Sequence, residues 1–349
     1  MLDAALSAKC HSGKPKFFTA LPKGSGLAFW MGDFASHRAA PVEQGSGMKR
    51  TTTRLKELLA RRTATPMPGA ANAMFARVIE DLGFEAVYVT GAGIANMYLG
   101  VPDIGLTTLT EIANHIAPIA DAIEIPMVVD ADTGFGNALN MMRTVKVMER
   151  AGAAGIQIED QVFPKKCGHF AGKDVIAIDE MVQKVKAAVD TRKDQNFQIV
   201  ARTDSRAVLG IDAAIERAQL LIEAGADATF VEAPLNEQEL ARIARELKIP
   251  QFANIVFGGR TPDLGRDKLA AMGFGAVLYA NAALQASIKA TQDVLGALQR
   301  DGSLAAVGDR LAGFAERQRT VKKDDYDALE QRYRVGAASP GLAARTVKE

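Results

Sequence analysis

Eight short β-rich runs alternate with helical segments between residues 65 and 281, and this alternation constrains the fold more than any other feature. The runs are mostly apolar, and several of the amphipathic segments between them end in Ala-Gly or Met-Gly, a common helix stop. Apolar strands separated by helices are typical of a parallel sheet that helices cover. Eight such units are the size of a closed (β/α)8 barrel, so we predict this α/β fold, with an open doubly wound sheet as the alternative. The predicted strands are 65–70, 86–90, 126–132, 155–160, 197–204, 228–234, 250–256 and 275–281.

Polar side chains gather at the carboxyl ends of these runs, whereas the strand starts carry Ala, Gly, Phe and Pro. The catalytic groups of a barrel lie at the carboxyl ends of its strands. This asymmetry indicates an enzyme, and a barrel kept as a binding or scaffold protein is the non-enzyme alternative. The end residues are Tyr88, Thr90, Gly91, Asp130, Asp132, Glu159, Arg202, Asp204, Glu232, Asn254 and Asn281.

The acidic residues at the strand ends predict a divalent cation. Carboxylates that converge on one barrel mouth repel each other, and a bound cation relieves that repulsion. Ligands that are all oxygen select a hard ion, which favours Mg2+ or Mn2+. The chain has four histidines and none of them has metal-ligand spacing, which argues against zinc.

The segment 158–173, IEDQVFPKKCGHFAGK, carries the densest set of reactive side chains. Cys167 follows Lys165 and Lys166 directly, and His169 lies two positions further on. Neighbouring positive charge eases ionisation of a thiol. We interpret the segment as a mobile loop that delivers a proton-transfer group, and a surface loop with an incidental cysteine is the alternative.

Two glycine-rich turns have competing interpretations. The segment 91–96, GAGIAN, follows a strand but lacks the third glycine of a dinucleotide fingerprint. We interpret the backbone N–H groups of Thr90, Gly91 and Ala92 as binders of a carboxylate instead. The segment 258–261, GGRT, follows the seventh strand, where barrels often bind phosphate, and an ordinary turn is an equal alternative.

Two single residues also have two interpretations each. Arg202 either forms a structural ion pair with Glu232 or Asp204 or, as we favour, binds a substrate carboxylate with its planar fork. Tyr88 either packs inside the barrel or contributes to the site, and we hold these interpretations equal.

The overall composition excludes several classes of partner. The net charge of +1 gives no indication of a nucleic-acid partner. The two cysteines, Cys10 and Cys167, lie in very different contexts, which argues against a disulfide framework and fits a reducing cytoplasm. No apolar run is long enough to span a bilayer.

The chain divides into three predicted parts. Residues 1–47 are rich in Gly, Ser and Ala without a sustained period, so we expect a poorly ordered leader that is non-native or reflects a misplaced start. The catalytic barrel is predicted over 48–299, beginning with a helix that Thr53 caps. A helical extension is predicted over 300–349, with fraying past residue 339.

Three motifs resemble those of the isocitrate lyase/phosphoenolpyruvate mutase superfamily. They are VDADTGFGNALN at 129–140, IEDQ at 158–161 and KKCGH at 165–169, and the last is typical of the carbon–carbon lyase branch. The resemblance extends from residue 55 to residue 290, nearly the whole predicted barrel. It implies a (β/α)8 barrel with a helix exchanged between subunits, usually in a homotetramer.

The resemblance also implies roles for individual residues. Mg2+ is expected near Asp130, with Asp103, Asp132 and Glu159 acting mostly through water. The implied catalytic residues are Cys167, which acts from a gating loop, Tyr88, Lys165, His169 and Arg202. The implied substrate ligands are Thr90, Gly91, Ala92, Gly168, Arg202, Glu232 and Asn254.

The implied reaction is the cleavage of a C–C bond. In the resembling lyases a metal lowers the pKa of the substrate hydroxyl, a 2-keto acid forms, and Cys167 would protonate the carbanion that leaves. After CGH the chain reads FAGK, closer to dimethylmalate lyases and oxaloacetate hydrolases than to methylisocitrate lyases, and no arginine lies near Gln285. We therefore favour a malate-type C4–C6 2-hydroxy dicarboxylate. A phosphonomutase acting on phosphoenolpyruvate or carboxyphosphonoenolpyruvate and an oxaloacetate hydrolase are the alternatives.

Overall fold

The computed structural model describes residues 49–166, 168 and 172–335 of the chain. The predictions made for the leader, for the far end of the tail, and for Cys167 and His169 concern residues outside these ranges and stay predictions. The described residues belong to a compact unit that runs over Lys49–Glu349.

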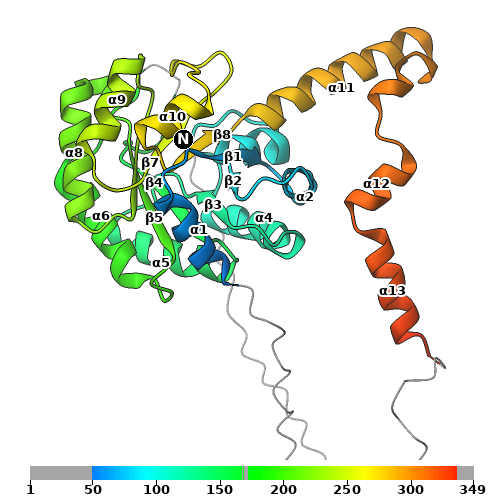
Figure 1. The fold of residues 1–349 in the computed structure, drawn as a ribbon, viewed down its shortest axis with the longest axis horizontal. Coiled ribbons are helices and arrows are strands. Elements are labelled where there is room, and N and C mark those ends of the chain that lie inside the picture. The colour runs from blue at the N-terminus through cyan, green and yellow to red at the C-terminus, as the bar shows by residue number, and fades with distance from the viewer. Residues whose placement is uncertain (1–48, 167, 169–171, 336–349) are drawn as a thin grey trace, which may run out of the picture. The chain divides into compact units, whose positions relative to one another are not determined.

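Eight parallel strands close into a barrel in sequence order, which confirms the predicted (β/α)8 fold (Figure 1). Closure occurs where β1 pairs with β8, with Met67 opposite Leu278. Each observed strand lies inside the run predicted for it, because strands that are buried on both faces consist mostly of apolar residues. The strands are β1 Thr65–Ala70, β2 Val87–Val89, β3 Met127–Asp130, β4 Gly155–Glu159, β5 Gln198–Thr203, β6 Ala228–Val231, β7 Gln251–Asn254 and β8 Ala276–Tyr279.

Helices surround the barrel and continue beyond its last strand (Figure 1). Five of the helices up to β8 begin at residues whose side chains cap them. Two of these residues, Thr108 and Asn137, form capping boxes. The helices up to β8 are α1 Thr51–Ala60, α2 Ala73–Asp81, α3 Gly91–Ile94, the π-helical turn η1 Ala95–Leu99, α4 Leu109–Ala122, α5 Ala138–Arg150, α6 Ile178–Thr191, α7 Arg206–Leu209, α8 Ile211–Glu223, α9 Glu237–Glu246 and α10 Arg266–Met272. Those after β8 are α11 Ala282–Asp301, the 3-10 turn η2 Ala305–Arg310, α12 Phe314–Thr320 and α13 Lys323–Tyr333.

The apolar core has an inner and an outer layer. Met67, Val128, Phe230 and Phe252 are buried together inside the barrel. Outside the strands, apolar faces of α2 and α4–α6 pack against one half of the barrel, and those of α8–α10 pack against the other half. Burial of this apolar surface from both sides is the main contribution that holds the parallel sheet together.

Helix α1 packs against the bottom of the barrel. Leu55 and Leu59 are 0% exposed and belong to the same cluster as the barrel interior. The prediction that Thr53 caps this helix is wrong, because the helix begins two residues earlier, at Thr51. The Thr53 hydroxyl instead accepts a hydrogen bond from the Asn196 amide at 3.0 Å, a contact that the local sequence could not reveal.

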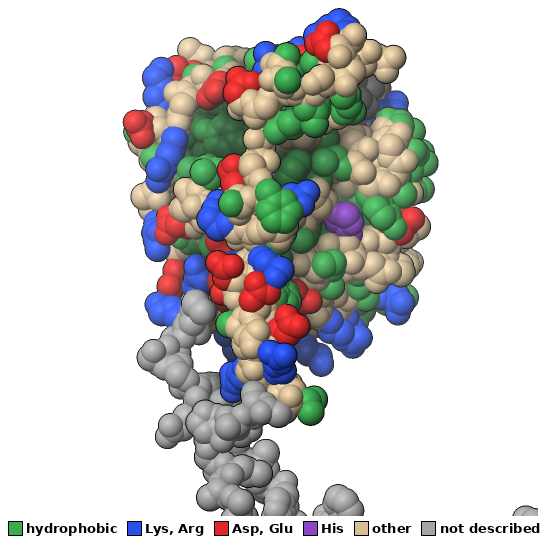
Figure 2. All heavy atoms as spheres, turned by 90° about the vertical axis from the view of Figure 1, so that its right-hand side faces the viewer, with side chains coloured by type: hydrophobic (Ala, Val, Ile, Leu, Met, Phe, Trp, Pro, Cys, Tyr) green, Lys and Arg blue, Asp and Glu red, His purple; other side chains and the backbone are tan. Residues whose placement is uncertain are grey.

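The helices after β8 expose many apolar side chains. Ile288, Leu295 and Leu298 of α11 are each more than a third exposed, and Phe314 of α12 is 74% exposed. Figure 1 shows α11 extending away from the strands, and Figure 2, which faces this side, shows hydrophobic side chains gathered there. Although α11 has 20 residues, no helix in the described ranges is long and apolar enough to cross a membrane.

An uncovered apolar groove lies on the barrel wall beside α2 and the start of α11. It has a volume of about 470 Å³, and Met74, Val78 and Leu82 of α2 contribute exposed side chains to it. In a (β/α)8 barrel each strand is followed by a helix that packs on the outside. This groove is therefore a surface that another helix can cover.

Candidate active site

A small cavity of about 30 Å³ opens at the carboxyl ends of the strands. It brings together most of the residues that the sequence analysis selected. Gly91, Asp132 and Glu159 are not part of the lining but contact lining residues, namely Asp130, Lys165 and Arg202 respectively. Cys167 and His169 fall outside the described residues. The lining residues are Tyr88, Thr90, Ala92, Asp103, Asp130, Lys165, Lys166, Gly168, Arg202, Phe230, Glu232, Asn254, Ala280 and Asn281.

The Lys165 ammonium lies among the acidic residues of this mouth. It forms an ion pair with Asp103 and a second one with Asp132, where Nζ lies 2.7 Å from Oδ1. The side chain of Lys165 is only 3% exposed. Burial alone would lower the pKa of Lys165, but the charges of Asp132 and Glu159 raise it well above its usual value. Lys165 is therefore charged and fixes two of the predicted metal ligands.

The acidic residues outnumber the basic ones at this mouth. Burial raises the pKa of Asp132 to about 6, although Lys165 acts in the opposite direction. Burial also raises the pKa of Glu159 well above its usual value, against the effect of Arg202. Burial therefore favours the neutral form of these two carboxyl groups, and a bound divalent cation would favour their ionised form.

The donor set fits a hard divalent cation. Asp130, Asp132 and Glu159 are buried carboxylates at or just past the ends of β3 and β4. Within the described ranges, no three acidic, histidine or cysteine side chains come close enough together to hold a metal by themselves. One or two carboxylates plus water are the usual ligands of Mg2+, so these residues suit that ion better than zinc.

Tyr88 is connected to Asp130 through a glutamine that the sequence analysis did not select. The Tyr88 hydroxyl donates to Oε1 of Gln157 at 2.6 Å, and Nε2 of Gln157 donates to Oδ1 of Asp130 at 3.4 Å. Burial raises the pKa of Tyr88 well above its usual value, so the phenol stays protonated. Gln157 could have been found from the sequence. It lies two positions before Glu159 in β4, and side chains two positions apart in a strand point to the same face of the sheet.

The turn after β2 is built differently from the predicted carboxylate cradle. The Thr90 N–H donates to the Ala70 carbonyl within the sheet, and the Gly91 N–H donates to Oδ2 of Asp130 at 3.3 Å. Thr90 also caps α3 by accepting from the Gly93 N–H. Two of the three expected N–H groups thus bind the protein itself in this structure.

Arg202 forms the structural ion pair with Asp204 that was the less favoured interpretation of this residue. Its Nε and Nη2 donate to the two oxygens of Asp204 at 2.8 and 3.0 Å. Nε also lies 3.3 Å from Glu159, and the guanidinium lies 5.2 Å from the centre of the Phe230 ring. Because Arg202 also lines the cavity, the pairing with Asp204 holds it in place there.

Two amide side chains at the same mouth suit a polar ligand. The buried Oδ1 atoms of Asn254 and Asn281 have no hydrogen-bond partner among the described residues. A buried amide oxygen without a partner is unfavourable, so a ligand that donates to it gains affinity. The GGRT turn at 258–261 does not line this cavity, which favours the interpretation as an ordinary turn.

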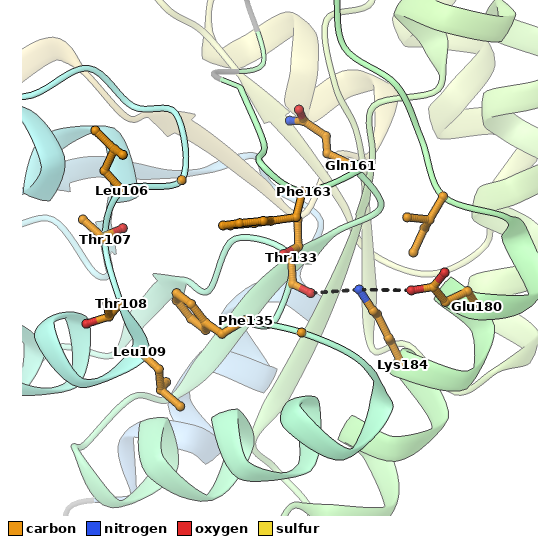
Figure 3. A pocket seen from close by; sticks show the side chains of 13 residues that line it. Leu106, Thr107, Thr108, Leu109, Thr133, Phe135, Gln161, Phe163, Glu180 and Lys184 are labelled. Carbon is orange, nitrogen blue, oxygen red and sulfur yellow. Dashed lines mark hydrogen bonds and ion pairs between the residues drawn. The ribbon is translucent and has the colours of Figure 1, made fainter. Parts of the chain in front are cut away.

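A larger and mostly apolar cavity lies beside the polar one. It has a volume of about 530 Å³ and lies between the loop before α4, the loop after β3 and the start of α6 (Figure 3). Phe135 and Phe163 point into it, and Nζ of Lys184 donates to the Thr133 carbonyl at 3.2 Å. This cavity is larger than the polar one, but the charged residues of its lining are Glu180 and Lys184, which pair with each other at 3.7 Å. The polar cavity, where several charged groups converge, is therefore the better candidate for chemistry.

A family model described as phosphoenolpyruvate phosphomutase matches residues 55–299, the whole barrel. The chain belongs to this family. The resemblance found in the motifs is thereby confirmed, and the polar cavity lies at the position where barrels of any family place their chemistry.

Three relatives of this family member carry different activities in their names. A 2,3-dimethylmalate lyase of Eubacterium barkeri is 45% identical, over 82% of this chain and 99% of the relative. A 2-methylisocitrate lyase of Aeropyrum pernix is 44% identical, over 78% and 88%. A chloroplastic carboxyvinyl-carboxyphosphonate phosphorylmutase of Arabidopsis thaliana is 42% identical, over 81% and 85%.

Solved structures of the superfamily share the fold. A 2,3-dimethylmalate lyase has a TM-score of 0.78 at 30% identity, covering 85% of this chain and 100% of that one. An oxaloacetate acetylhydrolase with 3,3-difluorooxalacetate has a TM-score of 0.76 at 30% identity, covering 80% and 96%. A phosphonopyruvate hydrolase with oxalate and Mg2+ has a TM-score of 0.74 at 29% identity, covering 82% and 99%. The relatives named lyases confirm the prediction that the chain is an enzyme of the carbon–carbon lyase class.

Proposed function

We propose that the chain is a Mg2+-dependent lyase that cleaves the C–C bond of a malate-type 2-hydroxy dicarboxylate to a 2-keto acid and a carboxylate. Dimethylmalate- and methylisocitrate-like compounds are the candidate substrates. The observation that carries the proposal is the cluster of Asp130, Asp132 and Glu159 beside Lys165 and Arg202 at the carboxyl ends of the strands. A cytoplasmic location remains part of this proposal.

The residues of the cavity have distinct roles in this reaction. Asp130, Asp132, Asp103 and Glu159 would hold Mg2+ (or Mn2+) mostly through water, and the ion would supply Lewis-acid stabilisation of the substrate hydroxyl oxygen in its deprotonated form. Lys165 holds Asp103 and Asp132 in place.

The remaining groups bind the substrate and transfer the proton. Arg202 and Asn254 bind the carboxylate end of the substrate, and Gly168 and Glu232 complete the pocket. The turn at Thr90, Gly91 and Ala92 lies against the keto-acid end. Tyr88 stays protonated and can donate a hydrogen bond there. In this scheme Cys167 protonates the carbanion and His169 assists it.

Two alternative activities have specific support. The Arabidopsis thaliana relative is named a phosphorylmutase, and the oxaloacetate acetylhydrolase structure belongs to a hydrolase. The KKCGH segment, which carries a thiol acid, favours the lyase, because migration of a phosphoryl group requires no such acid. A phosphonomutase and an oxaloacetate hydrolase therefore remain the second candidates.

A screen of 2-hydroxy acids tests the proposal. We expect the purified chain with Mg2+ to release a 2-keto acid from a dimethylmalate or a related C4–C6 substrate, measured through a coupled dehydrogenase. Oxaloacetate and phosphonopyruvate are run in parallel to detect the alternatives. Release of oxalate from oxaloacetate, or of phosphoenolpyruvate from phosphonopyruvate, with no cleavage of any hydroxy acid would overturn the lyase assignment.

We also propose that the chain forms a homotetramer in which α11 of one copy covers the groove beside α2 of another. The groove exposes Met74, Val78 and Leu82, and α11 exposes Ile288 and Leu295. Exposed apolar surfaces of this kind on a helix and on a groove are typical of an interface. The occupant of the groove is therefore a second copy of this chain.

Replacing Leu82 by Asp is expected to dissociate the assembly. A charge placed in an apolar interface is unpaired there, so we expect the mass measured by light scattering to fall from that of a tetramer. Leu139→Asp is the matched control, because Leu139 lies outside the groove and is 73% exposed, against 71% for Leu82. A tetramer that persists in Leu82→Asp, or a wild-type monomer, would contradict this arrangement.

A further inference from the structure

Lys173 lies at the far end of the segment that follows β4, and its side chain is only 1% exposed. The ammonium has two acceptors on different parts of the barrel. It donates to the backbone carbonyl of Gly168, and it donates to Oδ1 of Asp204 at 2.6 Å. A buried ammonium requires such partners, so these two contacts determine where the side chain lies.

Asp204 connects Lys173 to the arginine of the candidate site. It follows β5 directly, its side chain is 0% exposed, and the same carboxylate accepts both donors of the Arg202 fork. Burial alone would raise the pKa of Asp204, but the charges of Arg202 and Lys173 lower it below its usual value. One ionised carboxylate therefore binds both cations.

Gly168 lies directly against the floor of the cavity. A Cβ atom at this position would lie 2.3 Å from Oε1 of Glu232 and 2.5 Å from Nη2 of Arg202, so a side chain here would displace these groups. The backbone of Gly168 thus occupies the space beside two predicted substrate ligands. Its carbonyl is the group that Lys173 binds, so Lys173 connects the KKCGH segment to Arg202 through a buried charge network.

We propose that Lys173 is a positioning residue that fixes the backbone of Gly168 against Arg202 through its paired contacts with the Gly168 carbonyl and Asp204. The proposal rests on the proposed function for its kinetic consequence, since the KKCGH segment carries the proton donor of that reaction. It adds a residue that was not among the candidate site residues. Its contacts connect the segment after β4 to the residue that follows β5, which explains why the lysine is buried at the end of a polar segment.

A kinetic comparison of variants tests this role. Lys173→Met keeps the length of the side chain and removes its donors, and we expect kcat to fall about 100-fold, the cost of a small misplacement of a reacting group. The KM is expected to stay within a factor of about three, because the substrate ligands themselves are retained. Lys173→Arg, which can donate to both acceptors, should restore most of kcat. The control is Lys186→Met, which replaces an exposed lysine of α6 and should behave as wild type.

Hydrogen exchange without substrate separates this proposal from the proposed function. We expect amides of the peptide that contains Gly168 and Lys173 to exchange faster in Lys173→Met, with the barrel strands protected as in wild type. Lys173→Gln provides the same comparison if the methionine variant does not fold. Faster exchange in a chain that cleaves no hydroxy acid would keep the positioning role and reject the lyase. Unchanged exchange in the folded variants, or an equal loss of protection throughout the barrel, would overturn the positioning role.

Discussion

Replacing Asp130 by Ala is expected to lower turnover by about three orders of magnitude or more, and an excess of chelator should abolish turnover until Mg2+ or Mn2+ is restored. A divalent cation contributes several kcal/mol to the stabilisation of a developing negative charge, and each ~1.4 kcal/mol corresponds to a factor of ten in rate. Asp130 is 7% exposed at the end of β3, where it accepts hydrogen bonds from the Gly91 and Asp132 N–H groups. These contacts fix the carboxylate where the substrate would meet the ion.

Thermal stability gives a second measurement that does not depend on turnover. A ligand that binds the folded state raises its melting temperature, so Mg2+ should stabilise the wild type but not Asp130→Ala. Asp190→Ala is the control, because Asp190 is an exposed residue of α6. Full activity in excess chelator, or an equal shift of both melting temperatures on addition of Mg2+, would refute the metal assignment.

The sequence was sufficient to predict the barrel and to predict that most of the selected polar residues meet at the carboxyl ends of its strands. Burial on both faces leaves β-rich runs such as that of β4 mostly apolar, and the charged residues of the strands then lie at or near the carboxyl ends, as at Glu159 and Arg202. Inward-facing positions follow the two-residue period of a strand, so Tyr88 and Arg202 reach the same cavity. Local pattern and barrel geometry together therefore predict the lining of the site.

The partners of these residues could not be predicted in the same way. Lys165 pairs with Asp103, which lies 62 residues away, and no local period relates them. The fork of Arg202 could have faced either Glu232 or Asp204, and only the closed barrel shows that Asp204 accepts it. Lys173 looked like an ordinary charged residue of a polar loop, because its burial depends on the strand end that it packs against.

Replacing Cys167 by Ser is expected to lower turnover by roughly two to four orders of magnitude, the usual contribution of a general acid. Serine retains nearly the same size but is a far weaker acid than a thiol that neighbouring lysines help to ionise. The KM should change little, because the thiol serves the carbanion and not the bound substrate. Steady-state kinetics with the hydroxy acid identified in the screen measure both quantities.

Alkylation provides the independent measurement and the control. An alkylating reagent should inactivate the enzyme faster as the pH rises toward the pKa of the thiol, since the thiolate is the form that reacts. Cys10→Ser removes the other cysteine and should leave both the turnover and the inactivation rate unchanged. The lyase and the phosphonomutase make opposite predictions here, because phosphoryl migration leaves no carbanion that requires a proton. Wild-type turnover of the substrate by Cys167→Ser would therefore reject the thiol as the acid and make the phosphonomutase the leading candidate.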